Sequence, residues 1–211
     1  MGTNFKKFIL VSLVLLNSAF IYSQREAEKW KAQIALGVNS PLFSSFVNGL
    51  ASERINFPSV NMGLQHLTST HFGFKLDYGF NRIARKDIAT SFKINYSRIN
   101  AQIIYDLASW LEIIPERTKL IIHGGAGYSW SSPLANNSVN KLSYPNLISG
   151  LETHYYLTKL MSLYLDFSYI KGLASKDISG MSNGGLAGYN GDLFNVSVGL
   201  TFSLSGCYNC N

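Results

Sequence analysis

The chain has 211 residues, of which 46% are apolar, 13% aromatic and only 14% charged. Soluble domains average about 25% charged residues, and disordered segments combine high charge with few aromatic residues, so the composition excludes disorder. No run of about 18 apolar residues occurs, which excludes a conventional membrane-spanning helix. Two classes remain: a very apolar soluble β protein and a membrane-embedded β-barrel.

Residues 1–23 have the pattern of a cleaved secretory signal peptide. Lys6 and Lys7 form a short basic segment, an apolar stretch runs from Phe8 to Leu16, and Ser23 is a small residue suited to cleavage. The apolar stretch is too short for an anchor. Removing the two lysines from 18 basic residues leaves 16 against 12 acidic ones, a net charge of +4. These residues are scattered, so we expect no nucleic-acid partner, which would require a basic stripe.

Alternation with a period of two runs through the mature chain. It is strict, with one fully apolar face, over residues 30–38, 72–81 and 194–204. It is weaker over residues 59–66, 98–106, 120–130, 147–156 and 163–170. Because alternation of this length indicates a strand with one apolar face, the sequence predicts eight strands.

The connections between these segments alternate in length. Long connections rich in Ser, Asn and Gly cover residues 39–56, 82–95, 131–144 and 171–190. Short turns cover residues 67–71 and 157–160, and an intermediate connection covers 107–118. Long loops on one side and short turns on the other are typical of outer-membrane barrels. The even strand number then places both chain ends on the periplasmic side.

Aromatic residues are predicted to form two belts at the two headgroup levels of a bilayer. The lower belt is Trp30, Phe72, Tyr105, Tyr155 and Phe202; the upper belt is Phe80, Tyr96, Trp130, Tyr144, Tyr169 and Phe194. A soluble barrel of lipocalin type would instead carry Lys and Glu on its outer face. Here Gly, Ser and Asn dominate the polar face, which suits a crowded lumen. We therefore predict an all-β fold, an eight-stranded antiparallel up-and-down transmembrane β-barrel over residues 24–206.

Two motifs lie on predicted strands. The first is Gly124-Gly125-Ala126-Gly127-Tyr128-Ser129-Trp130, and the second comprises Ser197, Gly199, Phe202 and Leu204 of the last strand. With these motifs the chain resembles the small OmpA-like outer-membrane barrels of Gram-negative bacteria over about residues 30–204. The resemblance implies a cell outer-membrane location, and that the barrel-assembly machinery reads the second motif. Many relatives continue into a peptidoglycan-binding domain. This sequence stops at Asn211, so cell-wall tethering is not carried over.

Polar residues on the inward face predict a plugged lumen, because side chains can fill an eight-stranded barrel. The candidates are Lys31, Gln33, Lys75, Asp77, Arg98, Gln102, Asp106, His123, Glu152, His154 and Asp166. Buried charges must pair or they cost several kcal/mol each, and both signs are present. We expect a stabilising polar network; the alternative is a narrow gated ion path.

The sequence predicts no catalytic residue, metal ligand or cofactor. Glu152 and His154 share a face and could form a hydrolytic site with a serine, as in lipid-modifying outer-membrane enzymes, but no motif positions that serine. Gly124–Gly127 lacks the spacing of a dinucleotide-binding loop. His66 and His71 flank a short turn, where we expect them to be solvated.

The tail over residues 207–211 carries Cys207 and Cys210 in a C-x-x-C motif. In an oxidising periplasm we expect a local disulfide between them; the alternative is a handle for a partner protein.

Arg82, Arg85 and Lys86 fall in the second long loop, where we expect them to meet the anionic headgroups of lipopolysaccharide; the alternative is a solvated loop. The expected role is that of an outer-membrane protein that presents loops and docks to a larger complex. A narrow channel and a lipid-modifying enzyme remain as alternatives.

Overall fold

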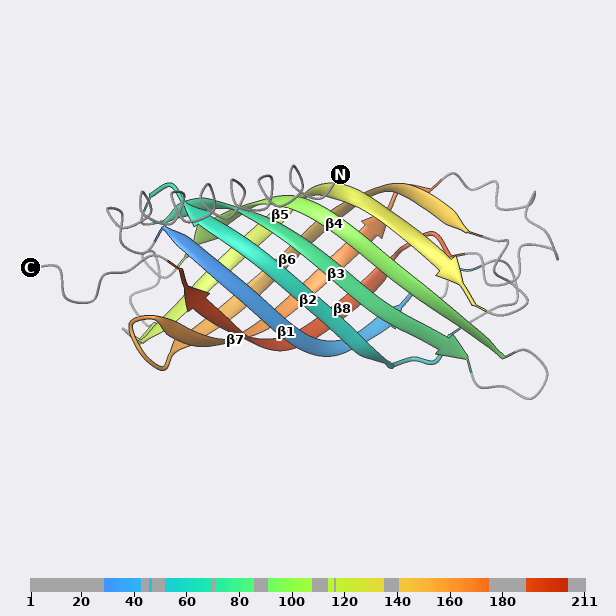
Figure 1. Cartoon of the computed structure of the whole chain (residues 1–211), viewed down its shortest axis with the longest axis horizontal. Coiled ribbons are helices and arrows are strands. Elements are labelled where there is room, and N and C mark those ends of the chain that lie inside the picture. Colours follow the sequence, from blue (N-terminus) through green and yellow to red (C-terminus); the bar gives the residue numbers. More distant parts are fainter. Residues whose placement is uncertain are drawn as a thin grey trace, which may run out of the picture.

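The computed structural model is a closed barrel of eight antiparallel strands in which each strand pairs with its neighbours in the chain and β1 pairs with β8 (Figure 1). It describes residues 29–42, 46, 52–69, 71–85, 91–107, 114–115, 117–134, 141–174 and 189–204. The strands are β1 (Trp30–Pro41), β2 (Asn56–Leu67), β3 (Phe72–Arg85), β4 (Phe92–Asp106), β5 (Thr118–Pro133), β6 (Leu142–Tyr156), β7 (Met161–Gly172) and β8 (Leu193–Ser203). The predicted eight-stranded up-and-down barrel is confirmed.

The two ends of the barrel differ in what they carry. Trp30 of β1 and Ser203 of β8 lie at one end, where the β2–β3, β4–β5 and β6–β7 connections also lie; we call it the terminal end. The other end, which we call the loop end, receives the remaining four connections. Within the residues that the structure describes, no helix is long and apolar enough to cross a membrane.

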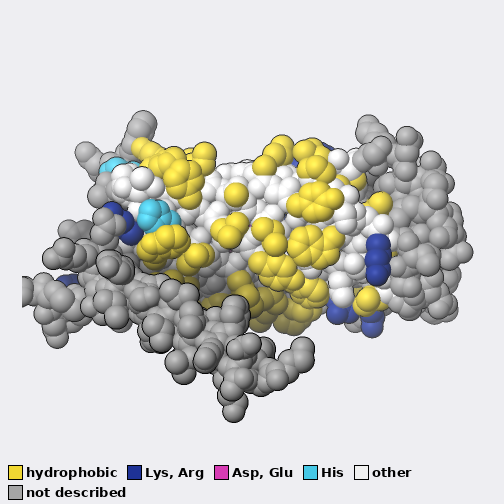
Figure 2. Space-filling model, turned by 45° about the horizontal axis from the view of Figure 1, so that its top comes forward, with side chains coloured by type: hydrophobic (Ala, Val, Ile, Leu, Met, Phe, Trp, Pro, Cys, Tyr) yellow, Lys and Arg dark blue, Asp and Glu magenta, His cyan; other side chains and the backbone are white. Residues whose placement is uncertain are grey.

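The outer wall of the barrel is apolar along most of its length. Large aliphatic side chains on it are about half exposed, for example Ile34 at 48%, Leu76 at 55% and Val198 at 51%. Inward-facing neighbours on the same strands, such as Gln33 and Asp77, are buried. Figure 2 shows apolar side chains gathered along one face of the barrel, with Lys and Arg near the two ends of that stretch. The wall thus has the polarity that a hydrocarbon surrounding requires.

All eight strands run further toward the loop end than the sequence predicted, and the difference is largest over the β3–β4 and β5–β6 pairs. β3 continues to Arg85, β4 begins at Phe92, β5 continues to Pro133 and β6 begins at Leu142. The loops predicted over residues 82–95 and 131–144 were therefore wrong, and the connections span only residues 86–91 and 134–141.

The alternation continues in these extensions, but the polarity of the two faces is reversed. Ile83 and Ile94 point inward and are fully buried, whereas Arg82 and Lys93 lie on the outer wall. The prediction depended on an apolar outer face, and that face ends where the strands pass beyond the aromatic belt.

At some inward-facing glycines, neighbouring side chains of the lumen occupy the space that a Cβ atom would need. A Cβ atom added at Gly150 would lie 2.4 Å from His123 Nε2 and 2.6 Å from the carbonyl oxygen of Phe167. Gly124 faces outward on β5, and a Cβ there would meet nothing closer than 3.5 Å. Position 150 is therefore a packing requirement of the lumen, whereas position 124 is not.

Replacing Gly150 with Ala should destabilise the barrel by about 1–3 kcal/mol, because the added methyl group overpacks the space between His123 and the β7 backbone. Urea unfolding in lipid vesicles measures the change. Gly124→Ala is the matched control and should change the free energy of unfolding little; equal effects at the two positions would contradict this packing account.

Candidate functional site

Glu152 of β6 is the centre of the polar lumen. Its side chain is fully buried and forms an ion pair with the Lys75 ammonium group of β3. Gln33 Nε2 donates to Glu152 Oε2 at 3.0 Å and Gln65 Nε2 at 3.4 Å, and His154 Nε2 lies 2.8 Å from the same oxygen. A carboxylate with this many donors retains its charge in a water-poor interior, because the donors replace its hydration shell.

A second hydrogen-bonded chain crosses the lumen from Asp77 to Asp166. Gln102 donates its amide N–H to Asp77, and Arg98 Nη2 lies 3.8 Å from the other Asp77 oxygen. The Gln102 carbonyl oxygen faces His123 Nδ1, and His123 Nε2 lies 3.0 Å from Asp166 Oδ1. Five of the predicted lumen residues thus form one chain across β3, β4, β5 and β7.

The His123 ring is held between two acceptor oxygens. The Gln102 amide N–H is used on Asp77, so its carbonyl oxygen faces one ring nitrogen, while an Asp166 oxygen faces the other. Both ring nitrogens are therefore engaged by side chains of neighbouring strands, which fixes the orientation of the imidazole in the lumen.

Two further pairs close the lumen toward the terminal end. Lys119 Nζ lies 2.9 Å from Asp106 Oδ2, and Lys31 Nζ donates to the Tyr156 hydroxyl at 3.2 Å. All eleven residues predicted for the lumen therefore belong to inward-facing positions, in two hydrogen-bonded groups at the centre and two pairs at the terminal end.

Several members of the network are absent from the predicted set of lumen residues. Asn61 accepts from Arg98 at 2.9 Å, and Gln65 donates to Glu152. A layer nearer the loop end links Asn100, Asn146 and Ser129, and the Tyr96 hydroxyl lies 2.7 Å from Ser129 Oγ. All share the inward parity of the charged residues, and that parity was the signal that could have found them.

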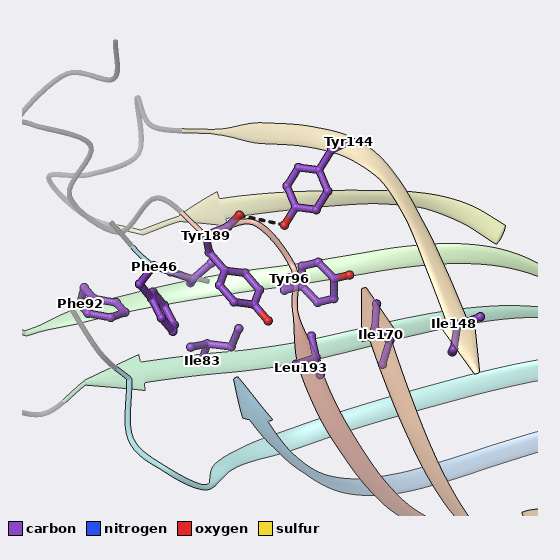
Figure 3. Packing of buried hydrophobic residues seen from close by; sticks show 10 residues of the cluster. Phe46, Ile83, Phe92, Tyr96, Tyr144, Ile148, Ile170, Tyr189 and Leu193 are labelled. Atoms are coloured by element: carbon purple, nitrogen blue, oxygen red, sulfur yellow. Dashed lines mark hydrogen bonds between the residues drawn. The ribbon is translucent and has the colours of Figure 1, made fainter. Parts of the chain in front are cut away.

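An apolar layer covers the polar lumen at the loop end (Figure 3). We call it the apolar cap. Its buried members are Phe46, Ile83, Phe92, Ile94, Tyr96, Tyr144, Ile148, Ile170, Tyr189 and Leu193. Phe46 and Tyr189 come from two different connections and pair as a β-bridge, with their rings 5.0 Å apart.

Hydrogen bonds fix Tyr189 inside the cap. Its carbonyl oxygen accepts from the Tyr144 hydroxyl at 2.8 Å, as Figure 3 shows, and its own hydroxyl donates to the Asp192 carbonyl at 2.9 Å. Burial raises the pKa of Tyr189 well above its ordinary value, so this hydroxyl keeps the proton that it donates. Phe46 of the β1–β2 connection and Tyr189 of the β7–β8 connection are thus held inside the loop end of the barrel.

Tyr96 and Tyr144 are corrections to the predicted upper belt. Tyr96 is fully buried and Tyr144 is 3% exposed, and both belong to the apolar cap. Tyr96 has the parity of inward-facing Arg98, and Tyr144 has that of Glu152, so strand geometry turns both rings inward. The other predicted belt residues lie on the outer wall: Trp30, Phe72, Tyr105, Tyr155 and Phe202 at the terminal end, and Phe80, Trp130, Tyr169 and Phe194 toward the loop end.

A serine does lie beside the Glu152–His154 pair. Ser162 Oγ of β7 is 3.3 Å from His154 Nδ1, while His154 Nε2 contacts Glu152, so the three residues have the order of a hydrolytic triad. All three are buried, and the cavity that borders His154 at the terminal end measures about 10 Å³. Such a space is about the size needed for one water molecule and cannot admit a lipid.

The lumen also brings together three residues that could ligate a cation. Ligand atoms of His123, Glu152 and Asp166 lie within 4.8 Å of one another. The Lys75 ammonium, however, is already bound to Glu152, and His123 is bound to Asp166. The lysine therefore supplies the positive charge that a metal ion would bring.

The remaining predicted residues fall into three groups. Ser197 and Gly199 of the last-strand motif face inward, Phe202 faces outward, and Leu204 follows β8 directly. Arg82 is on the outer wall, whereas Arg85 shares the inward face of β3 with Ile83. Lys86, Cys207, Cys210 and the segment 1–23 lie outside the described residues.

Comparisons with known proteins place the chain by its fold. No family model and no curated protein matches it. It is similar in structure to Neisserial surface protein A, with a TM-score of 0.55 and 16% identity over 83% of this chain and 96% of that one. It is also similar to the outer membrane protein OprG of Pseudomonas aeruginosa (TM-score 0.54, 10% identity, 87% and 99% covered). A major outer membrane protein of Thermus thermophilus gives a TM-score of 0.50 at 11% identity, with 81% and 98% covered. At these identities the likeness shows the barrel fold alone.

Removing one partner of the Lys75–Glu152 pair should destabilise the barrel by about 3–5 kcal/mol, because the other charge remains buried and unpaired. Glu152→Gln and Lys75→Met test this by urea unfolding in vesicles. The double variant K75M/E152Q should recover part of the loss. Lys119→Ala is the control: that lysine is 34% exposed, and its loss should cost about 1 kcal/mol or less. Additive single effects in the double variant would contradict the pairing.

Proposed function

We propose that the chain is an integral outer-membrane barrel of the small OmpA-like type, exported through a cleaved signal peptide, with a structural or protein-interaction role. The observation that carries this proposal is the distribution of polarity. An apolar outer wall flanked by aromatic side chains encloses a buried network of paired charges. A soluble barrel with this exterior would expose a large apolar surface to water.

A closed lumen supports a structural role over a channel. The network centred on Glu152 fills the middle of the barrel, and the apolar cap fills its loop end. An ion would have to displace the Lys75–Glu152 pair and then cross a layer lined by isoleucine and aromatic rings. Both layers oppose conduction, the first by its fixed pairs and the second by excluding water.

The lumen also supports a non-enzymatic role. Ser162, His154 and Glu152 have the order of a triad, but the adjoining cavity is about 10 Å³, and Glu152 is also paired with Lys75. A hydrolytic site must offer room for the acyl group and donors for its oxyanion. We propose instead that this chain of hydrogen bonds stabilises the terminal end of the lumen.

Interaction partners are proposed on the same basis. The Ser197, Gly199, Phe202 and Leu204 motif on the last strand is suited to recognition by the barrel-assembly machinery. The β1–β2 and β7–β8 connections are the long ones, spanning residues 42–55 and 173–192, and could present a surface to a larger outer-membrane complex. We propose that Cys207 and Cys210 form a local disulfide in the tail.

Expression in a Gram-negative host should place the protein in the outer-membrane fraction as a chain that begins at Gln24. Separation of the two membranes by density, followed by intact-mass measurement, tests both points. The reason is that the segment 1–23 has the pattern of an export signal and that a barrel with an apolar outer wall needs a membrane around it. Recovery in the periplasmic soluble fraction would contradict the proposal.

Planar bilayers that contain the refolded barrel should show no steady current. Phe46→Ala should leave the current at baseline, because the charged network still closes the lumen beneath the apolar cap. The double variant K75M/E152Q should also remain closed, because the cap is intact. A steady, reproducible conductance of the wild-type barrel would overturn the closed-lumen role and support the channel.

A further inference from the structure

At the outward-facing strand positions that the structure describes, charged residues are confined to one end of the barrel and to one sign. Among the outward-facing strand positions that the structure describes, the only Lys, Arg, Asp or Glu residues are Arg82 on β3, Lys93 on β4 and Lys171 on β7. All three are cations, and all three lie at the loop end. In these positions the terminal end of the same wall carries mostly aromatic and aliphatic residues, together with uncharged polar ones such as Thr118. The wall is therefore built for different surroundings at its two ends.

Arg82 and Lys93 are neighbours on the β3–β4 pair. Arg82 lies opposite Asn95, and Lys93 lies opposite Ala84, so the two cations occupy diagonal positions of one face. Diagonal neighbours are about 7–8 Å apart, within reach of long side chains. Asn95 in turn lies opposite Ser132 of β5. Two cations, an amide and a hydroxyl thus converge on one small area, which we call the β3–β4 basic site.

Within the residues that the structure describes, neither Arg82 nor Lys93 makes an ion pair. The Arg82 Nε atom and the Asn95 side-chain oxygen are buried without hydrogen-bond partners there. Lys171 differs, because its ammonium lies 2.6 Å from Asp192 Oδ2. Two neighbouring cations with no counter-ion in the described part of the chain fit an anion that comes from outside it.

The position of the site identifies the anion. Arg82 follows Phe80 by two residues on the outer wall, so the site lies directly beyond the upper aromatic belt. Belt residues mark the headgroup level, and a group at that depth, against the barrel wall, is a lipid phosphate. We propose that the β3–β4 basic site binds phosphate groups of lipopolysaccharide in the leaflet at the loop end.

This inference rests on the proposed outer-membrane barrel and changes one sequence prediction. Arg85 was expected to contribute, but it shares the inward face of β3 with Ile83. Lys93, which the sequence analysis passed over, takes its place on the outer wall. The reason is that β3 and β4 extend into the predicted loop. Within a strand, alternation places Arg82 and Arg85 on opposite faces, whereas in a loop both could face the same way.

The test uses the full mature barrel in phosphatidylcholine vesicles, with energy transfer from its tryptophans to dansyl-labelled lipopolysaccharide. R82S/K93S should weaken lipopolysaccharide binding roughly 20- to 30-fold, since each basic residue near an anionic surface contributes about fivefold. R82K/K93R keeps both charges and should bind within a few-fold of wild type. R117S/K159S removes two cations from the terminal end and should bind as wild type does.

The possible results separate the inference from the proposed function. Equal binding by wild type and R82S/K93S would overturn the site, as would an equal loss in R117S/K159S. Displacement of the label by inorganic phosphate at matched phosphate concentration would indicate a soluble-anion site and would also overturn it. Insertion is scored separately as protease-resistant, heat-modifiable barrel in the same vesicles. Failure of wild type to insert would contradict the proposed function; insertion without lipopolysaccharide binding would contradict only this inference.

Discussion

The ion pair between Lys75 and Glu152 is the interaction on which the rest of the barrel depends. An outer wall that faces hydrocarbon cannot hold charge, so the charged residues of the spanning region must lie inside. Inside, each charge is costly unless it is matched. Glu152 therefore binds His154 of its own strand and reaches Gln33, Gln65 and Lys75 on β1, β2 and β3. Because the paired side chains fill the lumen, Gly150 must stay small beside His123.

Beyond the upper belt the two faces of the barrel exchange their character. Once the strands leave hydrocarbon, the outer face can carry Arg82 and Lys93, and the inner face can pack Ile83, Ile94 and Tyr96 as a soluble protein would. The same strands thus enclose a polar lumen along the apolar wall and, at the loop end, a small apolar core like that of a soluble protein. The apolar cap closes the mouth and fixes Phe46 and Tyr189 at the start and end of the long loops.

The sequence predicts the orientation of side chains correctly along the apolar outer wall, and it fails for side chains of the apolar cap. The sequence predicts Trp30, Leu76 and Val198 on the outer wall correctly, because alternation and an apolar outer face agree there. It predicts Tyr96 and Tyr144 in the belt because aromatic residues near strand ends usually face lipid, yet their parity turns them inward. Ser162 had no sequence signal at all, because its approach to His154 depends on the register between β6 and β7.

The sequence by itself determined the number of strands, the inward parity of all eleven lumen residues and the even topology, because a period of two is a local property of the backbone. Only the tertiary structure decided which residues meet across the lumen, how far the strands extend and where the wall becomes polar. Those features depend on barrel closure and register, which bring Gln33 of β1 to Glu152 of β6 and set Lys93 beside Arg82. The alternation of residues within one strand shows which face a side chain is on, but not which residue of a distant strand it contacts.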